Sequence, residues 1–316
     1  MAKNRTVKPG RHERGNGQQP ARMCRVVMRR CRAGLLLLAA CSAVTFQAAS
    51  PANATGTRVD ALIEADRSAS STIWKSGLRE GLRAAFEPDA SLRVPGAPLL
   101  TARALLVPGT DLDAPVPLVR LSWDAVGVHI SNDSSIGTTW GIAMNLQESK
   151  PPSMGRYVAV WRHGGSGWRI VAYSLLGIAP PASKEWSHFR RTIPDAVTEV
   201  DAQRFFETDR AFARAAADGK AVTAFRTWAA PDAIMFERRG FMITGPDMIG
   251  KAVEGPARWS WEPLVGGGSG DLGWTVGEAV IAPDEAPPVR TKYLSVWRTS
   301  ADGTLRFILD AGSVRP

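Results

Sequence analysis

Three aspartates stand in otherwise apolar surroundings and are the first candidates for chemistry. Asp310 ends the run "LRFIL", while Asp66 and Asp209 each lie three residues after an apolar side chain, Ile63 and Phe206, in segments of helical periodicity. A carboxyl group in an apolar pocket loses solvation, so its pKa rises towards neutrality. Such a group can act as a general acid or base on a carbonyl-containing molecule.

Strand alternation argues against a pocket role for Asp310. Its segment predicts a β-strand, and a period of two puts Leu305, Phe307 and Leu309 on one face and Arg306, Ile308 and Asp310 on the other. The second face carries an arginine, and charged residues in strands are usually solvated or paired. The pattern therefore favours a structural pairing of Asp310 and leaves catalysis as the alternative.

Asp66 and Asp209 occupy matching positions, in "EADRSAS" from Glu64 and "ETDRAFA" from Glu207. An aspartate on a buried helical stripe must be hydrogen-bonded, either by backbone and Trp N–H groups or by a ligand. Its presence in both segments favours a structural tie, because one catalytic site would not need the duplicate. Asp209 nevertheless stays a candidate ligand-binding residue. The other candidates for a pocket are Glu237, Arg238, Trp259, Trp261, Glu278 and Tyr293.

Motifs for cofactors and metals are not supported by their context. "GSGDLG" from Gly268 fits the dinucleotide pattern G-x-G-x-x-G, but it precedes a predicted strand and therefore indicates a hairpin turn. Beyond the N-terminal region only His129, His163 and His188 occur, at no metal-ligand spacing. We therefore expect no cofactor and no metal.

The positive charge is concentrated at the N-terminus. The chain has a net charge of +9, yet residues 1–54 hold ten Lys and Arg against one Glu, which leaves 29 residues of each sign in the remainder. This distribution removes the argument for a nucleic-acid partner. All three cysteines also lie in this N-terminal region, so the rest of the chain holds neither a disulfide nor a thiol nucleophile.

Residues 1–54 have the layout of an export signal. Basic residues precede the apolar run "GLLLLAACSAVTF" from Gly34, and "ANA" at Ala52 to Ala54 is a small-x-small cleavage site, so we expect an exported, periplasmic or secreted protein. "LAAC" at Leu38 to Cys41 offers an alternative, lipidation of Cys41, which would attach the protein to a membrane. The start codon is Met1 or Met28.

Two segments of the chain repeat each other in order. "SIGTTWG" from Ser135 matches "DLGWTVG" from Asp271, and "YVAVWR" from Tyr157 matches "YLSVWR" from Tyr293. The predicted organisation is a leader over 1–54, a first domain over 55–178, a linker over 179–198 and a second domain over 199–316. At matched positions the first repeat has Tyr173, Val94 and Ile142 in place of Asp310, Glu237 and Glu278, which assigns any polar pocket to the second domain.

Each repeat is expected to have the same order of elements. Apolar residues at spacings of three and four predict helices first, followed by a short helix at "PDMIGKAV" from Pro246 and by a meander of long strands, "RWSWEPL", "LGWTVGEAVI", "KYLSVWRT" and "LRFILDAG". Shorter helices at 78–86 and 221–228 are each expected to close at a "PDA" break. The expected fold class is α+β, with helices on one face of an antiparallel sheet.

In this order, "ETDRAFA", "PDA", "LGWTVG", "YLSVWR" and "LRFILDAG" resemble the nuclear transport factor 2-like superfamily, in its SnoaL-like branch known as domain of unknown function 4440. The resemblance covers residues 57–316 as two copies. It implies two tandem cone-shaped domains, each a curved sheet wrapped round helices with a pocket at the wide end. Members include isomerases, dehydratases, cyclases and binding modules, so the fold alone does not assign chemistry.

Three functions remain open from the sequence. The first is a cell-envelope protein that binds a small apolar or aromatic molecule in the second domain. The second is a cofactor-independent isomerase or lyase with Asp310 as general acid or base. The third is a structural partner-binding module. Because domains of this superfamily often pair through their sheets, a tandem pair within one chain predicts a monomer.

Overall fold

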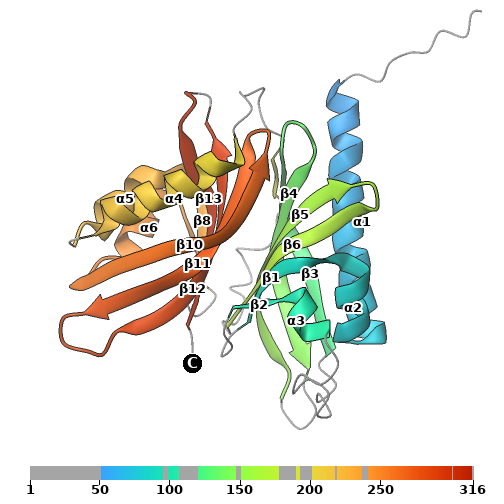
Figure 1. Cartoon of the computed structure of the whole chain (residues 1–316), viewed down its shortest axis with the longest axis horizontal. Helices are drawn as coiled ribbons and strands as arrows, with labels where there is room; N and C mark the ends of the chain where they lie inside the picture. The colour runs from blue at the N-terminus through green and yellow to red at the C-terminus, as the bar shows by residue number, and fades with distance from the viewer. Residues whose placement is uncertain are drawn as a thin grey trace, which may run out of the picture. The chain divides into compact units, whose positions relative to one another are not determined.

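The computed structural model describes residues 51–94, 99–106, 120–146, 151–177, 190–192, 201–217, 219–236, 241–300 and 302–314. Two tandem domains make up this part of the chain (Figure 1). The first contains α1 (Pro51–Ser76), α2 (Leu78–Ala85), β1 (Phe86–Arg93), β2 (Leu100–Thr101), α3 (Ala102–Leu106), β3 (Arg120–Ile130), β4 (Ile136–Leu146), β5 (Ser153–Gly164) and β6 (Gly167–Leu176). The second contains α4 (Ala202–Ala216), α5 (Ala221–Trp228), β8 (Ala229–Phe236), β9 (Met242–Thr244), α6 (Pro246–Ala252), β10 (Ala257–Ser269), β11 (Leu272–Pro283), β12 (Val289–Thr299) and β13 (Leu305–Val314).

The two sheets have the same strand order. The first runs β2-β1-β6-β5-β4-β3, extended at its edge by β7 (Arg190–Thr192), and the second runs β9-β8-β13-β12-β11-β10. Neighbouring strands are antiparallel except that β1 and β6, β8 and β13, and β3 and β7 are parallel. The expected fold class, α+β with helices on a largely antiparallel sheet, is confirmed, and both domains repeat it.

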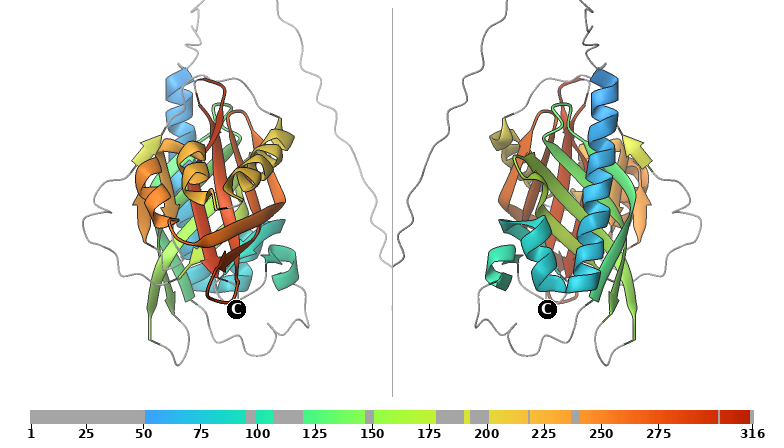
Figure 2. Two further views of the ribbon diagram at one scale, coloured as in Figure 1. Left: turned by 90° about the vertical axis from the view of Figure 1, so that its left-hand side faces the viewer. Right: turned by 90° about the vertical axis from the view of Figure 1, so that its right-hand side faces the viewer.

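Helices cover one face of each sheet. In the first domain α1 contacts β3 and β4, and Figure 2 shows α1 and α2 lying across that sheet. In the second, α4 contacts β10 and β11 while α5 and α6 pack together. α4 begins where the Asp201 side chain accepts a hydrogen bond from the backbone N–H of Gln203, and α6 has Pro246 in its first turn, as its sequence predicts. Among the described residues, no helix is long and apolar enough to cross a membrane.

The "PDA" segments do not end the helices. α2 and α5 stop at Ala85 and Trp228, and Pro88 and Pro231 lie inside β1 and β8. The pairing register shifts within both segments, between Phe86 and Ser91 and between Ala229 and Ile234. A proline that cannot donate to a ladder is tolerated at such an irregularity, so "PDA" marks a break in the strand and not the end of the helix.

Glycines with positive φ form the hairpin turns. Gly303 and Gly167 have φ values of 78° and 84° between the last two strands of each domain. Gly270, with a φ of 61°, turns β10 into β11, which confirms "GSGDLG" as a hairpin turn.

Side chains of both domains share one buried cluster. Val158, Val160 and Ala172 of the first sheet belong to the same apolar core as Leu294 and Leu309 of the second. A second cluster, formed by residues of the first domain alone, includes Leu62, Trp123 and Trp161. Each domain thus has apolar side chains packed between its helices and its sheet. Apolar residues of the two sheets also belong to one shared buried cluster.

Candidate functional site: a cavity in the second domain

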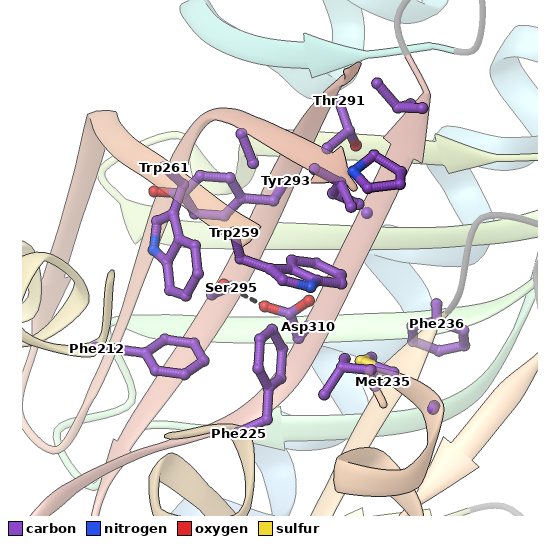
Figure 3. A pocket seen from close by; sticks show the side chains of 17 residues that line it. Phe212, Phe225, Met235, Phe236, Trp259, Trp261, Thr291, Tyr293, Ser295 and Asp310 are labelled. Carbon is purple, nitrogen blue, oxygen red and sulfur yellow. Dashed lines mark hydrogen bonds between the residues drawn. The ribbon is translucent and has the colours of Figure 1, made fainter. Parts of the chain in front are cut away.

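A cavity of about 310 Å³ lies between the helices and the sheet of the second domain. Its walls are mostly apolar and aromatic, and they come from the helices and from five strands (Figure 3). The lining residues that Figure 3 labels are Phe212, Phe225, Met235, Phe236, Trp259, Trp261, Thr291, Tyr293, Ser295 and Asp310. The volume falls at the lower end of the range for small-molecule pockets.

Asp310 lines this cavity, contrary to the expectation from strand alternation. The ladder between β12 and β13 pairs Val296 with Leu309 and Trp297 with Phe307, so Ile308 is an extra residue in a β-bulge. The bulge resets the alternation, and Phe307 and Asp310 therefore face the same side. Phe307 stacks on Phe212 of α4 with ring centroids 5.7 Å apart, which identifies that side as the one under the helices.

The Asp310 carboxyl has one hydrogen-bond donor next to it on the sheet. Ser295 on β12 donates from its hydroxyl to Asp310 Oδ2 at 2.7 Å, drawn as a dashed line in Figure 3. Burial raises the pKa of Asp310 to about 6, which the Ser295 bond and the positive charge of Arg93 partly oppose. The group is therefore close to a change of protonation state at neutral pH.

Trp259 brings a second polar atom to the cavity. Its indole Nε1 is buried and has no hydrogen-bond partner in the described residues. A buried N–H without an acceptor is uncommon in proteins, and a bound molecule is one means of satisfying it. The Trp259 ring packs edge-on against Phe225, with centroids 5.5 Å apart, so the donor is held by a rigid aromatic wall.

Asp209 lies behind the wall of the cavity and not in it. It accepts hydrogen bonds from Trp261 Nε1 at 2.8 Å and from the Tyr293 hydroxyl at 2.8 Å. Both donors are cavity-lining side chains, so Asp209 holds two walls in place. Burial raises the pKa of Asp209 to about 6, while hydrogen bonds from Thr275, Tyr293 and Trp261 act in the opposite direction.

The first domain repeats this arrangement around Asp66. The Thr139 hydroxyl donates to Asp66 Oδ1 at 2.6 Å, and the Tyr157 hydroxyl donates to both carboxyl oxygens at 3.1 and 3.0 Å. Trp161 donates to Thr139 at 2.9 Å, as Trp297 donates to Thr275 at 2.8 Å. The expectation that both aspartates are structural ties agrees with this geometry.

The structure describes four of the other residues predicted for a pocket. Trp259, Trp261 and Tyr293 line the cavity, but Glu278 does not. Ala279 lines it, and its neighbour Glu278 points to the opposite side of β11, where it borders a separate depression beside Glu262. Glu237, Arg238 and Cys41 lie outside the described residues. In the described part of the chain, no three His, Cys, Asp or Glu side chains form a group that could hold a metal ion.

Ser295 and Arg93 are not among the site residues predicted from the sequence. Ser295 lies two residues after Tyr293 on the same strand, so the alternation of β12 alone would have placed it in the cavity. Arg93 belongs to the first domain and is fully buried, and its Nη2 donates to the carbonyl oxygen of Lys292 at 2.8 Å. No local signal in the sequence relates Arg93 to a residue 199 positions away.

No protein-family model matches the sequence, and no curated protein does either. The solved structures to which the chain is similar include proteins described as NTF2-like. An NTF2-like protein of unknown function from Pseudomonas putida KT2440 is 16% identical with a TM-score of 0.31, over 36% of this chain and 89% of that one. An NTF2-like superfamily protein from Salmonella enterica is 15% identical with a TM-score of 0.33, over 42% of this chain and 98% of that one. A ketosteroid isomerase-like protein from Erwinia carotovora atroseptica is 14% identical with a TM-score of 0.31, over 34% and 92%.

Proposed function

We propose that the second domain binds a small apolar or aromatic molecule in the cavity that Asp310 lines. The observation that carries this proposal is that the aromatic walls of the cavity hold two polar groups. They are the Asp310 carboxyl and the unpartnered Trp259 N–H. Apolar walls with a few fixed polar groups are typical of small-molecule sites, since the walls supply affinity and the polar groups supply orientation. The ligand should carry an acceptor for Trp259 and a donor for Asp310.

The test uses 2-naphthol as an aromatic probe, with the ¹³C-methyl signal of Met235 as the reporter. Met235 lines this cavity, so its methyl resonance should shift on titration with 2-naphthol. Trp259→Phe removes the donor but keeps an aromatic wall, and it should weaken binding by roughly fivefold, the effect of one hydrogen bond. Arg103→Met, a substitution on the exposed surface of the first domain, is the control. An unchanged Met235 signal at saturating probe would refute the proposal.

A second candidate is a cofactor-independent isomerase or lyase that uses Asp310 as the general acid or base. The observation that favours it is the burial of this carboxyl in an apolar cavity, which raises its pKa to about 6. As a carboxylate, Asp310 would take a proton from the carbon next to a ligand carbonyl, leaving an enolate, and would then return a proton to that enolate. The atoms balance without a cofactor.

Deuterium uptake distinguishes catalysis from binding. In D₂O an active Asp310 should accelerate exchange at the α-carbon of 2-tetralone above the rate in buffer. Asp310→Asn should keep the fold and the affinity for the probe and lose the acceleration. Loss of thermal stability on this substitution would point to the structural role instead. The third candidate, a purely structural partner-binding module, needs no cavity of this size.

We also propose that the chain is a tandem member of the SnoaL-like, domain of unknown function 4440 branch, divided at the bounds predicted above. The support is the repeated order of motifs and elements. Hydrogen bonds between the domains, from Lys292 Nζ to the Val94 carbonyl at 3.0 Å and from the Asn132 N–H to Asp271 Oδ1 at 2.7 Å, support a monomer paired within itself. A homodimer by light scattering would contradict this state.

We propose further that the protein is exported to the periplasm or secreted. The leader over residues 1–54 supports cleavage after Ala54, with lipidation of Cys41 as the alternative. The intact mass of the protein recovered from a bacterial envelope separates the two, because cleavage leaves Thr55 first whereas lipidation leaves a modified Cys41. An uncleaved mass would exclude both.

A further inference from the structure

The first domain contains a cavity of its own, of about 430 Å³. Its lining residues come from helices and strands of this domain, including α1 and β6. In the described part of the chain, none of these lining residues is charged. Apart from Asn145, Ser153 and Tyr173, these residues are apolar side chains and glycines. This cavity is larger than that of the second domain and lacks its carboxyl group.

Two buried polar atoms in this cavity have no hydrogen-bond partner. They are the Tyr173 hydroxyl, in a side chain that is 2% exposed, and Oδ1 of Asn145. A phenol can donate one hydrogen bond and accept others, whereas an amide oxygen only accepts. Leaving such groups unpaired in an apolar interior costs free energy, so their shared position in one cavity points to a missing partner.

Tyr173 stands at the position that Asp310 occupies in the second domain. Tyr173 pairs with Ala159 on β5 as Asp310 pairs with Ser295 on β12, and it pairs with Leu92 on β1 as Asp310 pairs with Met235 on β8. The first domain also has the bulge, since Val160 pairs with Ala172 and Trp161 with Ile170. The same site in the fold therefore carries a carboxyl group in one domain and a phenol in the other.

The phenol stays uncharged. Burial raises the pKa of Tyr173 well above 10, as does the negative charge of Asp66. A charged ligand would enter a cavity with no opposite charge among its described lining residues and would lose its hydration without compensation. The selectivity expected of this cavity is therefore for a neutral molecule.

We propose that the first-domain cavity is a second binding site, which takes an uncharged lipophilic alcohol. The alcohol oxygen would accept a hydrogen bond from the Tyr173 hydroxyl, and Asn145 Oδ1 is a further acceptor among the residues that line the same cavity. The hydrocarbon part would lie against side chains such as Ile73, Phe86 and Leu121. This site is independent of the function proposed for the second domain.

The experiment uses 1-octanol and octanoate with the full exported chain at pH 8, followed through methionine methyl signals. Met154 lines the first cavity and Met235 lines the second, so the two sites report separately. We expect 1-octanol to shift the Met154 signal and octanoate to bind at least tenfold more weakly. Tyr173→Phe should weaken 1-octanol roughly fivefold at Met154, the effect of one hydrogen bond.

Asp310→Asn is the matched control in the other domain and should leave the Met154 titration unchanged. Octanoate binding as tightly as 1-octanol, or an affinity unaffected by Tyr173→Phe, would overturn the proposal. A response confined to Met235 would do the same, while still supporting a site in the second domain. A silent Met235 with a responding Met154 would support the first-domain site alone.

Discussion

Arg93 donates from Nη2 to the carbonyl oxygen of Lys292 at 2.8 Å, which brings a buried cation of the first domain to the sheet that carries Asp310. The charge of Arg93 lowers the pKa of Asp310 against the larger effect of burial. Burial in turn lowers the pKa of Arg93 to about 9, and the negative charge of Asp310 acts in the opposite direction. The charge state of the cavity in one domain thus depends on a side chain of the other.

Replacing Arg93 should therefore alter the titration of Asp310. Arg93→Met keeps an aliphatic side chain but removes the charge, so we expect the pKa of Asp310 to rise above about 6, by on the order of one pH unit. The measurement is a pH titration of the ¹³C carboxyl signal of Asp310, assigned through Asp310→Asn. Arg103→Met, whose charge is exposed, should leave the signal in place. A pKa that does not move would show that Arg93 does not act on this carboxyl.

The buried aspartates predict the pH dependence of stability. Burial raises the pKa of Asp66 and that of Asp209 from 3.8 to about 6 in the folded protein. In the window from about pH 4 to 6 the unfolded chain releases these protons and the folded protein retains them. The free energy of unfolding should therefore fall as the pH rises through this window, by about 3 kcal/mol for each group, and level off above it.

Denaturant titrations at pH 4 and pH 7 test this dependence. Asp209→Asn should remove the contribution of about 3 kcal/mol that this group makes. The difference between the free energies of unfolding at the two pH values should therefore shrink. Asp302 offers a contrast, because its exposed carboxyl has a pKa lowered by a hydrogen bond from Thr304. Its contribution is present above about pH 4 and is lost only on further acidification, so Asp302→Asn should leave the difference between pH 4 and pH 7 almost unchanged. An identical slope in the parent and in Asp209→Asn would contradict the first expectation.

Gly277 is expected to tolerate no side chain. A Cβ there would lie 2.1 Å from the carbonyl oxygen of Glu262 and 2.7 Å from the Tyr293 hydroxyl. Because the nearer contact is backbone, Gly277→Ala should separate the strands locally, disturb the bond between Tyr293 and Asp209, and cost about 1–3 kcal/mol. Thermal unfolding measures the loss. Gly165→Ala, where a Cβ would meet nothing within 4 Å, should be close to neutral, and equal melting temperatures for the two variants would refute the steric argument.

Much of the fold was accessible from the sequence because local signals agreed with tertiary structure. Pro246 in the first turn of α6, the glycine-rich turn between β10 and β11 and the strand-forming residues of β10 to β13 are short-range features, and the structure has the elements that they predict. The repeat itself gave the assignment of Tyr173 to the position of Asp310, and strand pairing confirms that equivalence.

The candidate site was less predictable because one extra residue in β13 shifts the alternation of side chains between the two faces of the sheet. Ile308 bulges out of the ladder, so alternation read from Leu305 assigned Asp310 to the wrong face. A bulge depends on pairing between strands and leaves no fixed pattern in a single segment. The contact of Arg93 with Lys292 is likewise long-range, and composition or periodicity cannot indicate it.

The apolar cluster shared by the two sheets has a consequence for unfolding. Val158 and Val160 of the first domain pack in the same core as Leu294 and Leu309 of the second, so melting either domain would expose core residues of the other. We expect calorimetry to show one heat-absorption peak, with calorimetric and van't Hoff enthalpies in agreement. Either half made alone would present an uncovered apolar sheet to water and would aggregate, which makes the tandem pair the smallest cooperative unit of this protein.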